Sequence, residues 1–153
     1  MKKLLYILLL LPLAFLGSCN DDDDTPNVNI EITLGNAVRD NNVVYIVKDT
    51  PFEIKSIVAQ GIGSKALITN VSYYWDYLRV GWNPIAPFNR TFDTSYATVG
   101  THILSITCEV AQEGKSLGVA AASFNVKVVD SVEELPEGTE PGDVVITFNG
   151  NPE

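Results

Sequence analysis

The chain has 153 residues, a formal net charge of −9, two cysteines and a single histidine. This length suits one domain of ordinary size, and two cysteines cannot build a disulfide-rich scaffold. The 10 basic residues form no basic stripe, so we expect no nucleic-acid partner.

The negative charge is concentrated at the two flanks. Of the 19 acidic residues, four form a run at 21–24 and seven follow Val129, which leaves eight between these flanks. Eight lysines and arginines lie in the same central stretch, residues 27–129, so its formal charge is zero. We therefore expect a neutral central domain between an acidic tether, residues 19–26, and an acidic tail, residues 130–153.

The N-terminal stretch has the layout of an export signal. Lys2 and Lys3 precede a 13-residue apolar segment, Leu4–Leu16. A membrane-spanning helix needs roughly 20 such residues, so this segment is too short to span. It is typical of a secretory signal peptide, and we expect residues 1–18 to be cleaved off before Cys19.

The quartet Leu16-Gly17-Ser18-Cys19 resembles the lipobox of bacterial lipoproteins. This resemblance implies that Cys19 carries a lipid, through which the protein binds the membrane. Several acyl chains anchor firmly, because each buried CH₂ contributes about 0.8 kcal/mol. The alternative is a secreted protein with a chance cysteine at this position.

The run of Asp21, Asp22, Asp23 and Asp24 resembles the export signal of Bacteroidetes-type surface lipoproteins. It implies a lipid-anchored outer-membrane protein that faces the cell exterior. The alternatives are a plain solvated tether and a periplasm-facing location.

The central stretch alternates apolar and polar residues with the two-residue period of half-buried strands. Within 101–110, His102, Leu104, Ile106, Cys108 and Val110 share one face, and within 52–60 Phe52, Ile54, Ser56 and Val58 do so. We expect an all-β fold, a single immunoglobulin-like antiparallel β-sandwich of about seven strands over residues 27–129. The apolar runs that predict strands are 28–34, 42–47, 52–60, 71–78, 101–110 and 122–129.

Three of these runs resemble a known family. "VSYYWDY", "VGTHILSITCEV" and "FNVKVV" resemble the immunoglobulin-like modules called PKD-like, in which an aromatic-Trp-Asp strand faces a strand that begins Gly-Thr-(His/Tyr). The family often has Gly-Asp-Gly after Trp-Asp, whereas here we expect Tyr77-Leu78-Arg79 to continue the strand. Cys108 has no disulfide partner, and we expect it to be a small buried hydrophobic residue against which Trp75 packs.

Candidate catalytic and cofactor motifs are missing from the sequence. No Gly-x-Ser-x-Gly elbow, phosphate loop or nucleotide signature occurs. His102 and Cys108 are too few ligands for zinc, and Asp76 is expected to make a cross-strand pair or a strand-end hydrogen bond. We therefore predict a protein that is not an enzyme, with no cofactor, no metal and no catalytic residue.

An aromatic segment around residue 82 is the best candidate for a binding site. Trp82 and Phe88 lie among two prolines, with Asn83, Asn89 and Arg90 beside them. Trp82 on a stiff loop would stack on a sugar ring, and the polar residues would supply hydrogen bonds. The alternative is that Trp82 and Phe88 fold back and plug the end of the sandwich.

The tail is rich in Pro, Gly and Glu, so residues 130–153 are expected to form an extended linker. Ser131 lies in an Asp-Ser-Val triplet that resembles the O-glycosylation signal of Bacteroidetes exported proteins. The segment "VVITF", residues 144–148, is a candidate strand that would add to a sheet edge of its own domain or of a partner.

The resemblances imply an accessory binding module of an outer-membrane nutrient-uptake system, with a glycan or an outer-membrane protein as partner. One alternative is a structural spacer or assembly subunit that acts through β-strand pairing. Another is a small hydrolase, which would need His102 to meet a carboxylate from elsewhere in the chain.

Overall fold

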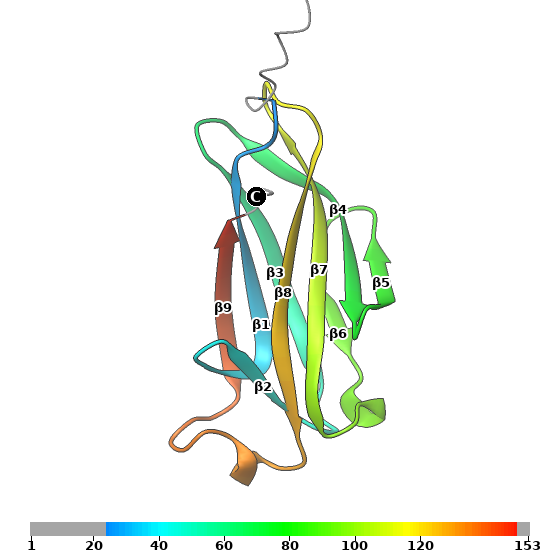
Figure 1. Ribbon diagram of the computed structural model, residues 1–153, viewed down its shortest axis with the longest axis vertical. Helices are drawn as coiled ribbons and strands as arrows, with labels where there is room; N and C mark the ends of the chain where they lie inside the picture. The colour runs from blue at the N-terminus through cyan, green and yellow to red at the C-terminus, as the bar shows by residue number, and fades with distance from the viewer. Residues whose placement is uncertain (1–23, 150–153) are drawn as a thin grey trace, which may run out of the picture.

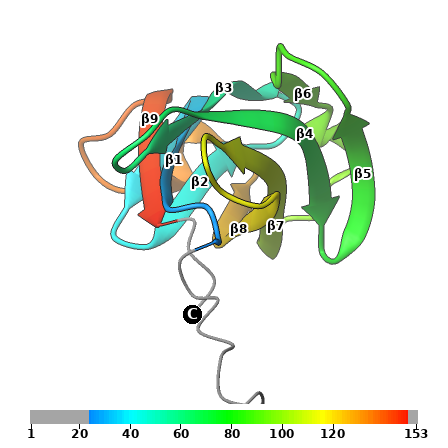
Figure 2. The same ribbon diagram turned by 90° about the horizontal axis from the view of Figure 1, so that it is seen from above.

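The computed structural model describes residues 24–149, and these form two β-sheets packed face to face (Figures 1 and 2). No helix in this part of the chain is long and apolar enough to cross a membrane. The strands are β1 (Val28–Asp40), β2 (Val43–Val47), β3 (Phe52–Gly61), β4 (Ala66–Trp75), β5 (Leu78–Asn83), β6 (Arg90–Phe92), β7 (Gly100–Gln112), β8 (Gly118–Val129) and β9 (Gly142–Asn149). Two short 3-10 turns accompany them, η2 (Thr94–Tyr96) and η3 (Val132–Glu134).

The strand order identifies the type of sandwich. One sheet has the order β9-β1-β3-β6 and the other β5-β4-β7-β8-β2, and the end of β1 joins them by pairing with β2. Only the β2–β8 pair is parallel among the described strands. A sheet with β7 between β4 and β8, packed on a sheet built from β1 and β3, is the immunoglobulin-like arrangement. The predicted all-β, immunoglobulin-like sandwich is confirmed, with nine strands and not about seven.

The core follows the predicted alternation in β7, where Leu104, Ile106 and Cys108 are fully buried. Burial raises the pKa of the Cys108 thiol to about 12, which agrees with an inert hydrophobic role. The expected contact between Trp75 and Cys108 is wrong. The register pairs Trp75 with Leu104 and places Cys108 opposite Val71.

In β3 the predicted alternation holds only for the first half of the strand. A bulge at the β1–β3 pairing places Lys55 as an extra residue in β3. A bulge shifts all later side chains by one position. Ile57 therefore points into the core, and Val58, expected on the inner face, is 47% exposed.

The strand predicted across residues 71–78 is interrupted. β4 ends at Trp75, and Asp76 and Tyr77, with φ of 47° and 69°, form a two-residue turn into β5. Positive φ at both central residues defines the type I′ hairpin turn. The expectation that Tyr77-Leu78-Arg79 continues the strand is wrong, because the chain reverses there.

The tail folds onto the sandwich and is not a free linker over its described part. β9 pairs antiparallel with β1, with Ile146 opposite Ile32, and Leu135 is buried. The candidate strand at 144–148 therefore exists and lies on the sheet of its own domain. The folded unit extends to Asn149, which corrects the predicted end of the sandwich at residue 129.

An ion pair on the surface joins β9 to β3 of the same sheet. Lys55 Nζ lies 2.6 Å from Asp143 Oδ1, and the lysine side chain passes over Gly35 of β1. A Cβ at Gly35 would lie 2.5 Å from Lys55 Cε, so any larger residue there would make the lysine side chain shift.

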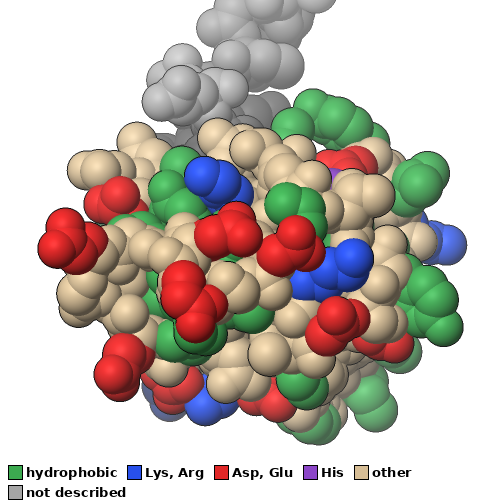
Figure 3. Space-filling model, turned by 90° about the horizontal axis from the view of Figure 1, so that it is seen from below, with side chains coloured by type: hydrophobic (Ala, Val, Ile, Leu, Met, Phe, Trp, Pro, Cys, Tyr) green, Lys and Arg blue, Asp and Glu red, His purple; other side chains and the backbone are tan. Residues whose placement is uncertain are grey.

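Because the tail is folded, acidic residues that were predicted to lie in a linker form part of an acidic surface of the domain. Figure 3 views the sandwich from below, at the end that carries η3, and shows carboxylate side chains spread over this end. The exposed acidic residues of this region include Asp49, Asp130, Glu133, Glu134, Glu137 and Glu140.

Candidate functional site

Trp82 lies on the edge strand β5 and not on a loop. It pairs with Ser72, which lies between the buried residues Val71 and Tyr73 and so faces outward. Since 56% of Trp82 is exposed, the predicted alternative of a Trp82 plug is wrong. Phe88 is buried, and its carbonyl accepts a 2.7 Å hydrogen bond from the Tyr73 hydroxyl.

The two asparagines of the predicted site differ in their roles. Asn83 Nδ2 donates to the carbonyls of Pro87, at 3.3 Å, and Asn89, at 3.1 Å, so this amide holds the loop between β5 and β6 in shape. The side chain of Asn89 is exposed. Only Asn89 therefore offers its amide to a ligand.

Arg90 begins β6 and reaches across the side of the sandwich to β5. Its guanidinium carbon lies 5.6 Å from the ring centroids of both Tyr73 and Phe92, and Nη2 donates to the Val80 carbonyl. Gly81 makes room, because a Cβ there would lie 2.1 Å from Arg90 Nη1. Arg90 joins the edges of the two sheets, and no described carboxylate forms an ion pair with it.

Beside Arg90 the two sheets leave a cavity of about 450 Å³, which we call the β5–β6 cleft. Its lining includes Trp75, Arg90, Phe92, Asp93 and Tyr96. The Phe92 and Trp75 rings pack with their centroids 6.2 Å apart, so one wall is a fixed aromatic surface.

η2 forms the other wall of the cleft. Asp93 Oδ1 accepts a 3.0 Å hydrogen bond from the Ser95 N–H. Hydrogen bonds from the Ser95 side chain and backbone lower the pKa of Asp93 below its usual 3.8, so it is ionised at neutral pH. Tyr96 is 90% exposed, and its ring stands at the rim.

The cleft offers the contacts that a hydroxyl-rich molecule needs. An exposed aromatic ring covers the apolar face of a sugar, a carboxylate accepts hydrogen bonds from hydroxyls, and a guanidinium donates them. A concave, mostly apolar site with a few polar groups is the usual form of a small-molecule site.

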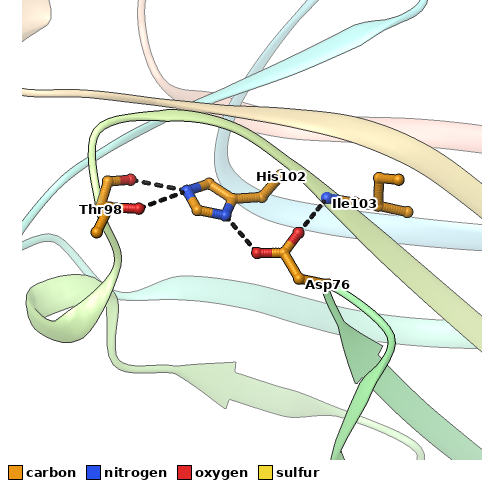
Figure 4. Close-up of polar contacts among 4 residues, drawn as sticks. All are labelled: Asp76, Thr98, His102 and Ile103. Atoms are coloured by element: carbon orange, nitrogen blue, oxygen red, sulfur yellow. Dashed lines mark hydrogen bonds and ion pairs between the residues drawn. The ribbon is translucent and has the colours of Figure 1, made fainter.

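His102, at the start of β7, is only 9% exposed and connects three segments (Figure 4). Its Nδ1 lies 2.6 Å from Asp76 Oδ2, and its Nε2 lies 2.8 Å from the Thr98 carbonyl oxygen. The second Asp76 oxygen accepts from the Ile103 N–H at 2.9 Å. The His102 ring also packs against Trp75, with centroids 5.1 Å apart.

This pair supplies the carboxylate that the hydrolase alternative required, but in an arrangement unsuited to catalysis. A general base needs a ring nitrogen that can reach the proton of a nucleophile. Nδ1 faces Asp76 and Nε2 faces the Thr98 carbonyl, so both nitrogens are occupied by structural partners.

Several predicted site residues lie outside the described part of the chain. Cys19 and residues 21–23 are among them, so lipid attachment and the export signal stay predictions. Asp24 is exposed, and its carbonyl accepts a 2.7 Å hydrogen bond from the Ser116 N–H. Ser131 is half-buried, and its glycosylation stays a prediction. Within residues 24–149 no group of three or more His, Cys, Asp or Glu side chains is placed to hold a metal ion.

The sequence predicted Arg90 as a site residue and Phe92 and Tyr96 as members of the same aromatic segment, but not that these residues share one cleft with Trp75 and Asp93. Their proximity depends on β6 lying across from β5, which periodicity does not show. One local signal was present, because Asp93 before Thr94-Ser95 is a preferred N-cap residue for a short turn.

Comparisons with known proteins identify no family. No protein-family model matches the chain, and neither does any curated protein. Among solved structures, a fibronectin(III)-like module of Clostridium thermocellum CbhA is similar, with 17% identity and a TM-score of 0.41. The match covers 62% of this chain and 96% of that one. The assignment of an immunoglobulin-like sandwich rests on the strand pairing of this chain itself.

Proposed function

We propose that the chain is a non-catalytic surface lipoprotein of the Bacteroidetes type, with a PKD-like domain, held by Cys19 in the outer membrane and facing the cell exterior. It serves as an accessory module of a nutrient-uptake system and binds a glycan. The lipobox-like quartet and the acidic run support the location. The β5–β6 cleft supports the binding activity.

The observation that carries the binding proposal is the composition of the cleft. The exposed ring of Tyr96 stands beside the ionised Asp93 and the unpaired cation of Arg90. Aromatic and hydrogen-bonding groups of both kinds therefore converge on one cavity. Trp82 lies on β5 as well, but its ring is on the outward face of the strand and does not line the cleft.

The fold also supports a suitable orientation. Asp24, which follows the proposed anchor closely, is bonded to Ser116 at the β7–β8 turn. η2 lies toward the opposite end of the sandwich (Figure 1). A lipid at Cys19 would thus place the η2 wall of the cleft away from the membrane.

The test is a binding screen of the full-length protein, in detergent, against starch, xylan, galactomannan and other soluble polysaccharides. We expect Tyr96→Ala to weaken binding by up to about tenfold, since one lost stacking contact is worth about 0.5 to 1.5 kcal/mol. Trp82→Ala reports whether the outward face contributes. Leu117→Ala, an exposed residue at the β7–β8 turn, is the matched control. Binding that survives Tyr96→Ala unchanged would contradict the cleft as the site.

Strand pairing with another protein is the second candidate function. β9 pairs only with β1 among the described strands, so its outer edge is open to a partner, such as an outer-membrane protein. Val145, 52% exposed on β9, is the place to test this. We expect Val145→Lys to abolish any self-association or partner binding that uses this edge, measured as mass in solution.

A further inference from the structure

His102 faces two groups that only accept hydrogen bonds. The Thr98 backbone oxygen has no proton to give, and an ionised Asp76 carboxylate has none either. Distances of 2.8 Å from Nε2 and 2.6 Å from Nδ1 mean that the ring donates at both nitrogens, whereas the Thr98 hydroxyl lies farther from Nε2, at 3.4 Å. A ring that donates at both nitrogens is an imidazolium, so this geometry favours the charged form.

The electrostatic surroundings agree with this protonation state. Burial lowers the pKa of His102, but its hydrogen bonds to Asp76 and Thr98 and the charge of Asp76 outweigh burial and raise the pKa above 6.5. Asp76 is the titratable group that contacts the ring. Trp75 from β4 and Val126 from β8 are uncharged neighbours. Arg90 and Asp93 in the cleft form no ion pair with His102.

We propose that His102 is a pH-dependent clasp of the β5–β6 cleft: its protonated ring holds Thr98, and with it the η2 wall, against the Asp76 turn, and loss of the proton releases this wall. The consequence for ligand binding rests on the proposed function above. The clasp itself does not.

The position that opens on deprotonation follows from the chemistry of the two contacts. A neutral ring has one N–H, and the bond to the carboxylate is stronger than the bond to a neutral carbonyl. Nδ1 therefore keeps its proton, and a bare Nε2 faces the lone pairs of the Thr98 oxygen. Thr98 is exposed and its carbonyl bonds to His102, so loss of the Nε2 bond removes a restraint on its segment. Thr94 stays fixed, because it is buried and donates to the Thr50 carbonyl at 2.7 Å, so the part of the wall that moves is Tyr96 and Ala97, which precede Thr98 directly.

The substitution Asp76→Asn removes the charge of the carboxylate but keeps the size and shape of the side chain. Asn suits the positive φ of this turn position, so the hairpin is expected to persist. Its amide can donate to a neutral Nδ1, and an Nε2–H then donates to Thr98, which satisfies every partner without a charge. Asp49→Asn, also at positive φ and exposed in another turn, is the matched control.

The experiment is an NMR titration of full-length, ¹⁵N-labelled protein in detergent micelles, without ligand. The chain has one histidine, so its ring signals are unambiguous. We expect a His102 pKa above 6.5, with both nitrogens protonated at lower pH. Hydrogen exchange at the Ala97 amide, which bonds to the Thr94 carbonyl, should rise about tenfold through the same titration after correction for intrinsic rates.

In Asp76→Asn the pKa of His102 should fall to 6.5 or lower, and the exchange step at Ala97 should vanish, while Asp49→Asn behaves as wild type. A wild-type pKa at or below 6.5, or Ala97 exchange that ignores the titration, would overturn the clasp. Polysaccharide affinity is then measured on both sides of the His102 pKa. Weaker binding at the higher pH supports the coupling between the clasp and the ligand site. If His102 titrates and Ala97 exchange follows it, but no polysaccharide binds at either pH, the proposed function is overturned and the clasp is not.

Discussion

Single buried contacts hold the cleft in shape. The Tyr73 hydroxyl is buried and donates to the Phe88 carbonyl at 2.7 Å, which fixes the loop that leads into β6. Burial, helped by nearby Cys108 and opposed by Arg90, raises the pKa of Tyr73 to about 12, so the hydroxyl stays neutral and able to donate.

Tyr73→Phe should therefore destabilise the protein. Removal of the hydroxyl leaves the Phe88 carbonyl buried without a partner, which costs about 1 to 3 kcal/mol. Urea denaturation measures the change, with Tyr74→Phe on the half-buried opposite face as control. A cost equal to that of the control would show that the buried bond contributes nothing.

At this scale the sequence predicted some contacts and missed others. The inward faces of β7 residues follow from alternation alone, and Arg90 was named from its aromatic neighbours. For Asp76 the sequence predicted a cross-strand pair or a strand-end hydrogen bond, and both are present, but His102 was not predicted as its partner. The reason is that Asp76 reaches the ring from a turn, and nothing in its neighbours indicated one.

Strands and turns determine where the cleft forms. The β4–β5 hairpin turns at Asp76 and Tyr77, where an L-residue at positive φ is strained. Asn-Gly or Asp-Gly is the usual pair for this turn, so the turn could not be predicted from a sequence that has Tyr77 at the second position. The β3 bulge was missed for a similar reason, because it depends on the pairing partner β1 and not on β3 alone.

Tyr77→Gly should stabilise the hairpin. Glycine removes a left-handed strain of about 1 to 2 kcal/mol and adds a smaller entropic cost, which leaves a gain of about 0.5 to 1 kcal/mol. Thermal unfolding measures it. A lower melting temperature for Tyr77→Gly would mean that the exposed tyrosine ring makes a stabilising contact.

β9 gives an equally clear prediction for the tail. A chain that ends at Val129 should melt well below the full chain, because it loses Leu135 from the core and exposes the β1 edge that β9 covers. A chain that ends at Asn149 is the control. Equal melting temperatures for the full chain and for the chains that end at Val129 and Asn149 would show that the tail does not stabilise the domain and is only a linker.

The pH dependence of stability belongs to the whole molecule. His102 has a raised pKa, so its stabilising effect is complete below 6.5 and is lost as the pH rises through its folded pKa. Asp76 has a lowered pKa, because hydrogen bonds from His102 and Ile103 outweigh its desolvation. Its effect is present above 3.8 and lost as the pH falls through its folded pKa.

The free energy of unfolding should therefore be higher at about pH 5.5 than at about pH 8.5. Denaturation at the two pH values measures the difference, and His102→Gln should remove most of it. A wild-type protein that is more stable at the higher pH would contradict a stabilising, protonated His102.

The class of fold could be predicted from the sequence, because half-buried strands show an alternation of apolar and polar residues. The path of the tail could not, since its composition is that of a linker and only the partner strand β1 makes β9 part of the sheet. The cleft was only partly readable, as it exists where two sheet edges meet.

The most direct test of glycan binding at the β5–β6 cleft is to map where the best-binding polysaccharide of the screen contacts ¹⁵N-labelled protein, by amide chemical-shift changes. We predict changes centred on residues 90–97, and several-fold more polysaccharide needed to reach them in Tyr96→Ala. Changes confined to β9, or saturable binding with no change at the cleft, would contradict this site.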